Sequence, residues 1–402
     1  MTLSDPSGAV GGAAAAALAA QAERAAASGA LAEARGLLQQ ATALDPASFA
    51  PWMSLAGCCR ALGDLAAALE AVDRALGIDA RSFVALLMKA SLLERLGAPH
   101  GAGAAYGIAL TQAPPPDRLA PQLRAPVEHA RQVHARYEHA LAASLREQLD
   151  GEAPRGGPAA RRLDDFVGRL TGKRRVYHQE PVLFHYPGLP ELEFHDREDF
   201  PWIEDLEAAT ADIREELLGV FADDAEGLEP YIAYPPNVPL DQWAELNHSP
   251  RWGSYHLLRD GLPVEAHARR CPKTMAALAA MPQPHVVRRS PAAMFSVLQP
   301  RTRIPPHTGI ANTRLVVHLP LIVPDGCGFR VGNETRLWRE GHAWAFDDTI
   351  EHEAWNDSDA PRTVLICDVW NPRLSEEERE AIAAVIAAMD AFDGARPGGD
   401  GL

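Results

Sequence analysis

Two histidines and one arginine in the C-terminal half of the chain could together bind a metal ion and an organic acid. His307 follows a Pro-Pro turn at the head of a β-type run, His352 lies in an acidic turn, and Arg362 begins an apolar run. Non-heme iron oxygenases need imidazole ligands on one face of the metal and open positions elsewhere. An arginine suits a cosubstrate carboxylate, because its planar fork donates two parallel hydrogen bonds. Each histidine has the alternative interpretation of an ordinary turn or core residue, since the chain contains 15 histidines.

Short β-type runs separated by turn residues must hold these side chains. Several runs alternate apolar and polar residues with the period of half-buried strands, and their spacing predicts an antiparallel barrel or jelly roll. The runs cover residues 294–298, 314–322, 328–331, 343–346 and 363–369. After them, Ser375 and Glu378 form a capping-box pattern, which predicts a C-terminal helix that continues to about Phe392.

The N-terminal 115 residues are rich in Ala and Leu and predict helices throughout. A period of 34 residues relates Gly29 to Gly63 and Gly97, and small or large residues recur in the same phase. These in-phase positions are Ala34, Ala68 and Ala102; Leu38, Val72 and Tyr106; and Ala41, Ala75 and Ala109. The pattern resembles the tetratricopeptide repeat, a helix–turn–helix unit that buries its apolar face by stacking on its neighbours. The glycines are expected in the turn between the two helices of each unit.

Length and composition predict an α+β protein with two domains. The 402 residues are 47% apolar, which is enough for two cores. We expect an all-α repeat solenoid over residues 12–150, with about three repeats and a capping helix, and a Gly- and Pro-rich linker over 151–162. A β-rich domain is expected over 163–394, followed by a disordered tail over 395–402.

Charge and cysteine content exclude several classes of function. Lys and Arg total 38 and Asp and Glu total 54, and this net charge of −16 argues against nucleic-acid binding. Five scattered cysteines predict neither a disulfide framework nor a zinc site. The sequence shows no signal peptide and no membrane span, so we expect a cytoplasmic protein.

The β-rich half resembles the aspartyl/asparaginyl β-hydroxylase family over roughly residues 285–373. The matching segments have nearly gap-free spacing: Phe295-Ser296-Val297, Ile304-Pro-Pro-His307-Thr308-Gly309, Asn312-x-Arg314-Leu315, His318-Leu319, Asn333-Glu334-Thr335-Arg336-x-Trp338, Phe346-Asp347-Asp348, Glu351-His352-Glu353-x-Trp355 and Asp368-Val369-Trp370. The resemblance implies a double-stranded β-helix (jelly-roll, cupin-like) oxygenase domain that uses Fe(II), 2-oxoglutarate and O2. Carried over by position, it makes His307 and His352 the Fe(II) ligands. It also implies that Arg362 and Ser296 bind the distal carboxylate of 2-oxoglutarate, and that His318 lies near the other carboxylate.

Two positions set this site apart. Gly309 stands where most such iron sites have Asp or Glu, two residues after the first histidine. The resembled family shares this glycine, which implies water at the vacant position, and a halide is the alternative. Val316 stands where animal members of the family have an arginine, whereas Arg314 matches a family arginine and is expected on the same strand face as Val316.

Other residues near these positions receive structural interpretations. Trp338, Trp355 and Trp370 are expected in barrel packing. The acidic residues around His352 are expected to form its turn and to orient its imidazole. These are Asp347, Asp348, Glu351 and Glu353.

The resemblance predicts a 2-oxoglutarate-dependent dioxygenase that hydroxylates a C–H bond, with the β-carbon of Asp or Asn in a protein or peptide as the expected target. The concave face of the repeats could hold that substrate, or the repeats could instead mediate assembly. Two alternatives remain: a hydroxylase of a lipid or small molecule, and an inactive adaptor built on the repeats. The sequence does not determine the oligomeric state.

Overall fold

The computed structural model describes residues 6–149, 154 and 156–392. The chain divides into two compact units, Met1–Arg174 and Arg175–Leu402. The predicted tail over 395–402 lies outside the described residues.

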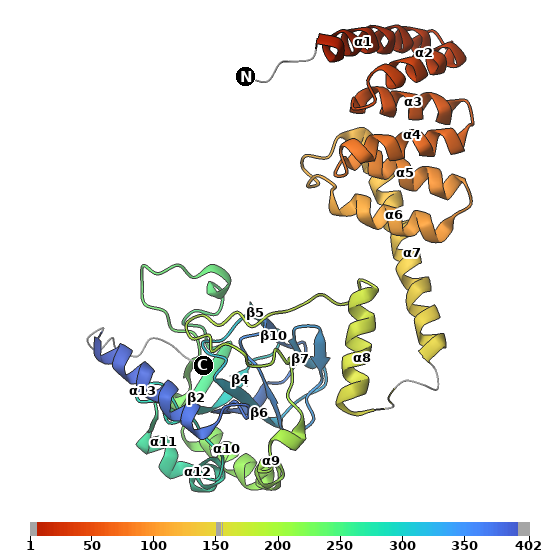
Figure 1. Ribbon diagram of the computed structural model, residues 1–402. Helices are drawn as coiled ribbons and strands as arrows, with labels where there is room; N and C mark the ends of the chain where they lie inside the picture. Colours follow the sequence, from red (N-terminus) through yellow and green to blue (C-terminus); the bar gives the residue numbers. More distant parts are fainter. Residues whose placement is uncertain (1–5, 150–153, 155, 393–402) are drawn as a thin grey trace. The chain divides into compact units, whose positions relative to one another are not determined.

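The first unit is a stack of helical pairs (Figure 1). Its helices are α1 (Pro6–Ala27), α2 (Leu31–Leu44), α3 (Phe49–Ala61), α4 (Leu65–Ile78), α5 (Phe83–Arg95), α6 (Pro99–Thr111), α7 (Arg124–Leu149) and α8 (Gly157–Leu170). The in-phase alanines Ala34, Ala68 and Ala102 are fully buried, as a close helix–helix approach requires. The arrangement confirms the predicted helical repeats, with α7 in the place of the expected capping helix.

Each helical pair turns at its repeat glycine. Gly29, Gly63 and Gly97 have φ angles of 85°, 83° and 75°, and each lies between the two helices of its pair. An L-residue with a side chain adopts this left-handed conformation only at a cost, so the 34-residue period of glycine has a backbone cause.

We predict that Gly63→Ala destabilises the repeat unit by about 1–2 kcal/mol, because a Cβ atom disfavours a positive φ angle. The matched control is Gly36→Ala. Gly36 lies within helix α2, and a Cβ atom added there would have no neighbouring atom within 4 Å. That control should instead stabilise by roughly 0.5–1 kcal/mol. Chemical denaturation followed by circular dichroism measures both, and equal effects of the two substitutions would contradict the explanation.

The predicted linker over 151–162 is wrong in its second part. Helix α8 begins at Gly157 and has Pro158 in its first turn. A proline there supports a helix start, because its fixed φ is helical and its missing N–H would have no helical partner. The Gly-Gly-Pro sequence therefore precedes a helix rather than continuing a linker, and residues 151–153 and 155 lie outside the described residues.

Two antiparallel sheets form the centre of the second unit (Figure 1). The larger sheet has the order β1-β2-β4-β11-β6-β9, with β3 paired to β2, and the smaller has the order β5-β10-β7-β8. The strands are β1 (Glu229–Pro230), β2 (Trp252–Arg259), β3 (Leu262–Pro263), β4 (Ala293–Leu298), β5 (Thr302–His307), β6 (Arg314–Ile322), β7 (Cys327–Val331), β8 (Glu334–Arg336), β9 (Trp344–Phe346), β10 (His352–Asn356) and β11 (Arg362–Trp370). These sheets, with the helical first unit, confirm the α+β class with two domains. From β4 onward the chain distributes its strands between the two sheets, an order compatible with the predicted double-stranded β-helix.

Alternate residues of the larger sheet contribute to two different cores. On one face, Phe295 and Leu365 pack with Ile213 and Leu217 of helix α10. On the other face, Met294 packs against side chains of the smaller sheet. The residues of the neighbouring strands that point to this face, which are every second residue, belong to the same core. The helices of this unit are α9 (Ile203–Ala208), α10 (Thr210–Asp223), α11 (Glu265–Arg270), α12 (Pro272–Ala279) and α13 (Glu376–Phe392). The space between the sheets is therefore the place where side chains from both can meet.

Helix α13 begins with the predicted capping box. The Ser375 N–H donates to Glu378 Oε2 at 2.8 Å, and the Glu378 N–H donates to Ser375 Oγ at 3.2 Å. Among the residues that the structure describes, no helix combines the length and apolar character that crossing a membrane requires.

The buried His195 makes the stability of the second unit depend on pH. This residue is 4% exposed, and neither ring nitrogen has a hydrogen-bond partner among the described residues. Burial, followed by the Arg373 charge, lowers its pKa from 6.5 to about 4. Because the unfolded chain binds the proton more tightly, this contribution is complete above pH 6.5 and is lost as the pH falls to about 4. The full loss is about 3 kcal/mol.

We predict that His195→Phe weakens the acid destabilisation between pH 6.5 and pH 4. Denaturant titrations of the variant and the unsubstituted chain at several pH values measure this difference. The contributions of the other histidines cancel, because both proteins contain them. Identical pH profiles would show that His195 is not neutral in the folded state.

Candidate active site

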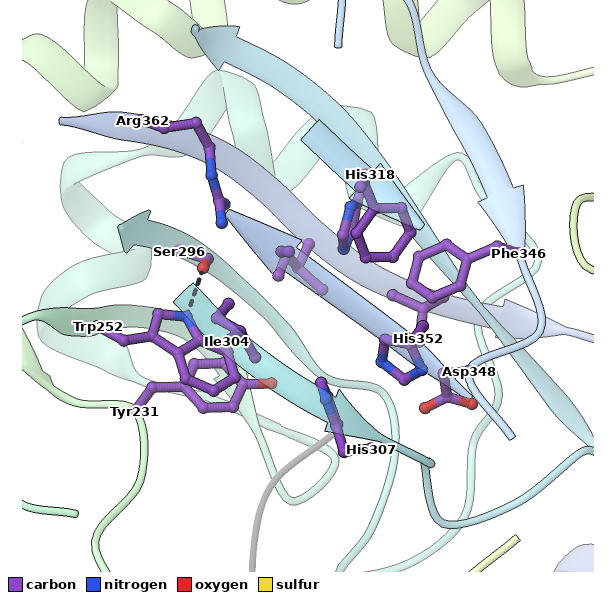
Figure 2. A pocket seen from close by; sticks show the side chains of 14 residues that line it. Tyr231, Trp252, Ser296, Ile304, His307, His318, Phe346, Asp348, His352 and Arg362 are labelled. Carbon is purple, nitrogen blue, oxygen red and sulfur yellow. Dashed lines mark hydrogen bonds between the residues drawn. The ribbon is translucent and has the colours of Figure 1, made fainter. Parts of the chain in front are cut away.

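A pocket between the two sheets brings the predicted site residues together (Figure 2). Ser296, His307, His318, His352 and Arg362 all line it, and they come from five different strands. The sheets therefore place in one cavity five side chains that are spread over 67 positions of sequence.

Strand register explains the positions on the larger sheet. Ser296 on β4 pairs with Val364 on β11, which places Arg362 one pleat away on the same face. His318 on β6 pairs with Ile366, two pleats from Arg362. The pocket face of β4, β11 and β6 thus presents a hydroxyl, a guanidinium and an imidazole side by side.

A β-bulge directs His307 into the pocket. On β5, Ile304 pairs with Ala354 of β10, and His307 pairs with His352. Between these two pairs the chain advances by three residues along β5 but by only two along β10. A regular strand would point residues 304 and 307 to opposite faces, and the irregularity lets both line the pocket. The prolines between them suit a bulge, because they cannot donate a ladder hydrogen bond.

The structure corrects the local conformations that were predicted from the sequence for His307 and His352. His307 ends strand β5 rather than heading a strand after a turn, because the Pro-Pro pair lies within the strand at the bulge. His352 begins strand β10 rather than lying in the acidic turn, because it pairs with His307 on one side and with Val331 of β7 on the other.

Both imidazoles expose the same nitrogen to the cavity. The His307 Nδ1–H donates to the Pro305 carbonyl at 2.8 Å, and the His352 Nδ1–H donates to the Ile350 carbonyl at 3.1 Å. A carbonyl can only accept, so each ring keeps its proton on Nδ1 and has a free lone pair on Nε2. The ring centroids lie 4.0 Å apart.

Burial keeps the two rings neutral. Burial and then the neighbouring His352 lower the pKa of His307 to about 3, and burial lowers the pKa of His352 to about 4. Neutral imidazoles with free Nε2 atoms are the form that binds a transition metal. In the described part of the chain, no group of three or more His, Cys, Asp and Glu side chains has metal-binding geometry, so these two rings would be the whole protein ligand set.

The acidic residues around His352 form structure without touching its ring. Asp347 accepts hydrogen bonds from the Thr349 N–H and hydroxyl, whereas Glu351 and Glu353 pair with Arg330. The backbone carbonyl of Ile350 holds the imidazole, so the expectation that carboxylates orient it is wrong.

Asp348 fills the space beside Gly309. A Cβ atom built on Gly309 would lie 2.0 Å from Asp348 Oδ2, and the same carboxylate pairs with Arg314 at 3.2 Å. Asp348 lines the pocket and is 3% exposed, and its buried Oδ1 has no hydrogen-bond partner in the described part of the chain. The Asp348 carboxylate, from the connection between β9 and β10, thus occupies the space that a metal-binding side chain at residue 309 would need.

We predict that Gly309→Ala destabilises the protein by about 1–3 kcal/mol, because its Cβ would overlap the Asp348 carboxylate in a packed interior. The control Gly253→Ala, on β2, should change stability far less, since its Cβ would meet only Glu229 O at 3.6 Å and Leu228 Cδ2 at 3.8 Å. Thermal unfolding compares the two. A Gly309→Ala protein that unfolds at the original temperature would show that the carboxylate can move away freely.

Arg362 is a buried cation without an acidic partner. Its side chain is 1% exposed, and Nε and Nη1 are buried with no hydrogen-bond partner among the described residues. Burial lowers its pKa only to about 10, so it remains charged at neutral pH. A buried charge is expected to be paired, and the missing partner here points to an anionic ligand in the pocket.

The two ends of the pocket differ in character. The buried Nδ1 of His318 has no hydrogen-bond partner among the residues that the structure describes, and burial and then Arg362 lower the pKa of this histidine well below its ordinary value. Val316 lies on the same strand face as His318 and contributes an apolar side chain to the pocket. Arg314 instead forms an ion pair with Asp348. The pocket therefore combines a cation at one end with two imidazoles and the apolar Val316 side chain at the other.

Two aromatic side chains of the pocket were not expected from the sequence. Tyr231 and Trp252 stack with ring centroids 3.7 Å apart, and Trp252 Nε1 donates to Ser296 Oγ at 3.0 Å (Figure 2). Strand β2, which carries Trp252, was missed because its eight residues are almost continuously buried and lack the alternation of a half-buried strand. Its flanking turn residues and aromatic content were the available signal.

Comparison with known proteins decides which family this pocket belongs to. Residues 207–372 match the family model described as Aspartyl/Asparaginyl beta-hydroxylase. The region is an aspartyl/asparaginyl β-hydroxylase domain. Residues 25–106 match the tetratricopeptide repeat model, so this hydroxylase domain follows a repeat region in the chain.

Relatives of the hydroxylase domain act on different substrates according to their names. The human aspartyl/asparaginyl beta-hydroxylase is 36% identical over 174 residues, which are 43% of this chain and 21% of that protein. The ornithine lipid ester-linked acyl 2-hydroxylase of Rhizobium tropici is 34% identical over 196 residues, which are 48% of this chain and 66% of that protein. The chain thus covers less than two thirds of each. Among solved structures, the Arabidopsis OM64 TPR domain aligns to 30% of this chain and 98% of its own, with 17% identity and a TM-score of 0.27.

Proposed function

We propose that the chain is an Fe(II)- and 2-oxoglutarate-dependent dioxygenase that hydroxylates a C–H bond. The observation that carries this proposal is the Arg362 cation, which has no acidic partner among the described residues, in the same pocket as two neutral, identically oriented imidazoles. A dicarboxylate that bridges the two ends would give the cation its missing partner. When bound, the metal and cosubstrate would supply oxidation by O2, in which 2-oxoglutarate becomes succinate and CO2 and one oxygen atom enters the substrate.

The residues of the chain would bind, orient and protect this chemistry. His307 and His352 would offer their Nε2 lone pairs to Fe(II), held by the carbonyls of Pro305 and Ile350. Arg362 and Ser296 would bind the far carboxylate of the cosubstrate. His318, whose Nδ1 has no partner, would lie near the carboxylate at the metal end, where Val316 contributes no charge.

Asp348 favours hydroxylation over halogenation. A halide would need the space beside Gly309, and the Asp348 carboxylate takes that space in its pair with Arg314. A second anion there would face like-charge repulsion in a buried site. A water molecule next to the Asp348 carboxylate would face no such repulsion, because it can donate a hydrogen bond to the carboxylate.

For the substrate, we propose the β-carbon of an Asp or Asn residue in a protein or peptide, as the name of the human relative suggests. The repeats would bind that protein or a partner of the enzyme. A cytoplasmic location fits the sequence. The second candidate is an acyl chain of a lipid, which the name of the Rhizobium tropici relative supports.

Succinate release separates these candidates. The purified chain with Fe(II), 2-oxoglutarate and O2 is incubated with a library of Asp- and Asn-containing peptides, or with ornithine lipids in detergent. Peptide-dependent succinate, together with a mass increase of one oxygen atom on the peptide, would support the first substrate, and lipid-dependent succinate the second. Cosubstrate that neither binds nor turns over would instead support the inactive adaptor.

A further inference from the structure

Helix α8 separates its apolar and charged residues onto different faces more sharply than any other described helix of eight or more residues. Ala159, Leu163, Phe166 and Leu170 follow one another at helical spacing, which places them on a single face. These four residues form the α8 stripe. Phe166 is 58% exposed and Leu170 is 55% exposed. Large apolar side chains that are exposed side by side mark a contact with a partner more often than single ones do.

Helix α8 is held in the first unit through another of its faces. It packs beside α7 (Figure 1). Val167 is 8% exposed, and Gly168 is also buried. Just after the helix, a Cβ atom built on Gly172 would overlap the Glu138 carboxylate of α7, so the two segments are in close contact there. The α8 stripe is therefore left over after the helix has been fixed in place.

The segment that carries the stripe is basic, although the protein is acidic. Residues 157–174 contain five Arg or Lys and two Asp, whereas the whole chain has a net charge of −16. Both Asp side chains form ion pairs with arginines of the same segment, at 2.7 to 3.0 Å. Arg162 and Lys173 are exposed. The segment therefore offers an apolar and cationic surface, which is complementary to an anionic one.

We infer that α8 is a docking helix for an anionic lipid surface. The α8 stripe enters the boundary between headgroups and acyl chains, and the basic side chains pair with lipid phosphates while their aliphatic stems lie along the apolar face. A few side chains of one helix cannot supply the roughly 800 Å² that each partner of a stable protein complex buries. Interfacial helices bind through this combination of a narrow apolar face and positive charge. The inference rests on the first unit alone and does not depend on the proposed function.

Co-sedimentation with vesicles tests this contact. The full chain is mixed with vesicles of phosphatidylcholine, with or without phosphatidylglycerol as the anionic lipid, and the bound fraction is measured. The chain should bind the anionic vesicles, and added salt should weaken this binding, because exposed charges are screened. Phe166→Ser combined with Leu170→Ser should weaken binding at least about tenfold. Arg162→Gln combined with Lys173→Gln should have an effect of about the same size.

Val84→Ser combined with Ile108→Ser is the matched control. Val84 on α5 and Ile108 on α6 are 48% and 57% exposed in the same unit, and their replacement should leave vesicle binding unchanged. A fluorescence measurement then locates the contact. Lipids with brominated acyl chains should quench the tryptophan added by Phe166→Trp, compared with the unsubstituted chain, and should not quench the one added by Ile108→Trp.

Three results with vesicles would overturn the inference: no binding to anionic vesicles, equal binding to neutral and anionic vesicles, or equal losses in the control. A dimer that forms without lipid and is dissociated by Phe166→Ser with Leu170→Ser would also overturn it, because a second copy of the chain would then cover the α8 stripe. Sedimentation equilibrium measures that state. These measurements need no turnover, so a failure of the proposed oxygenase chemistry would leave their outcome unchanged.

Discussion

His307→Ala and His352→Ala are each expected to abolish Fe(II) binding and turnover. In the proposed site only His307 and His352 would hold the metal, so removal of either would leave a single imidazole, which is too few to retain the ion. Calorimetric titration of Fe(II) under anaerobic conditions should show loss of at least about a hundredfold in affinity, beyond the range attributed to outer-shell partners.

His195→Ala is the matched control for these variants. His195 is also buried and neutral, with a pKa lowered to about 4, but it does not line the pocket. It should bind Fe(II) normally even if it is less stable. Normal metal binding by both His307→Ala and His352→Ala would refute the ligand assignment.

Arg362→Met is expected to weaken 2-oxoglutarate binding strongly and, at the same time, to stabilise the ligand-free protein. Arg362 is buried, and no acidic side chain in the described ranges pairs with it, so the folded protein bears the desolvation of a charge with little compensation. Replacing a buried charge with an apolar side chain of similar length commonly stabilises by about 1–4 kcal/mol. The loss of two charge-assisted hydrogen bonds should weaken cosubstrate binding by at least about a hundredfold.

Arg314→Met provides the opposite stability result. Arg314 is also buried, but it pairs with Asp348, so its replacement leaves that carboxylate buried and alone. This variant should lose about 3–5 kcal/mol of stability. Thermal unfolding of both variants without cosubstrate provides the comparison. Destabilisation by Arg362→Met to the same extent would mean that the Arg362 charge has a partner within the protein.

The sequence predicts most of what depends on periodicity. The recurrence of Gly63 and Ala68 in phase with their counterparts follows from turn conformation and helix contact, and both properties act within one repeat. Strand β6 has the predicted bounds, 314–322, since its length and apolar residues distinguish it. The capping box of Ser375 and Glu378 was equally local.

What the sequence does not predict depends on contacts between distant segments. The bulge that directs His307 into the pocket forms only because β5 pairs with β10. Trp252 reaches the pocket only because β2 pairs with β4. The pair between Arg314 and Asp348 likewise joins residues that are 34 positions apart. Residue types alone indicated the chemistry of the site, but its electrostatic asymmetry, with Arg362 unpaired and Arg314 paired, required the packed structure.

The most direct test of the proposed chemistry is the visible spectrum of the full chain titrated anaerobically with Fe(II) and 2-oxoglutarate. We predict a weak charge-transfer band that requires both components, is absent in His352→Ala and needs a much higher 2-oxoglutarate concentration in Arg362→Met. No band with the unsubstituted chain, together with no binding of 2-oxoglutarate, would contradict the account and make the repeats the functional part of the protein.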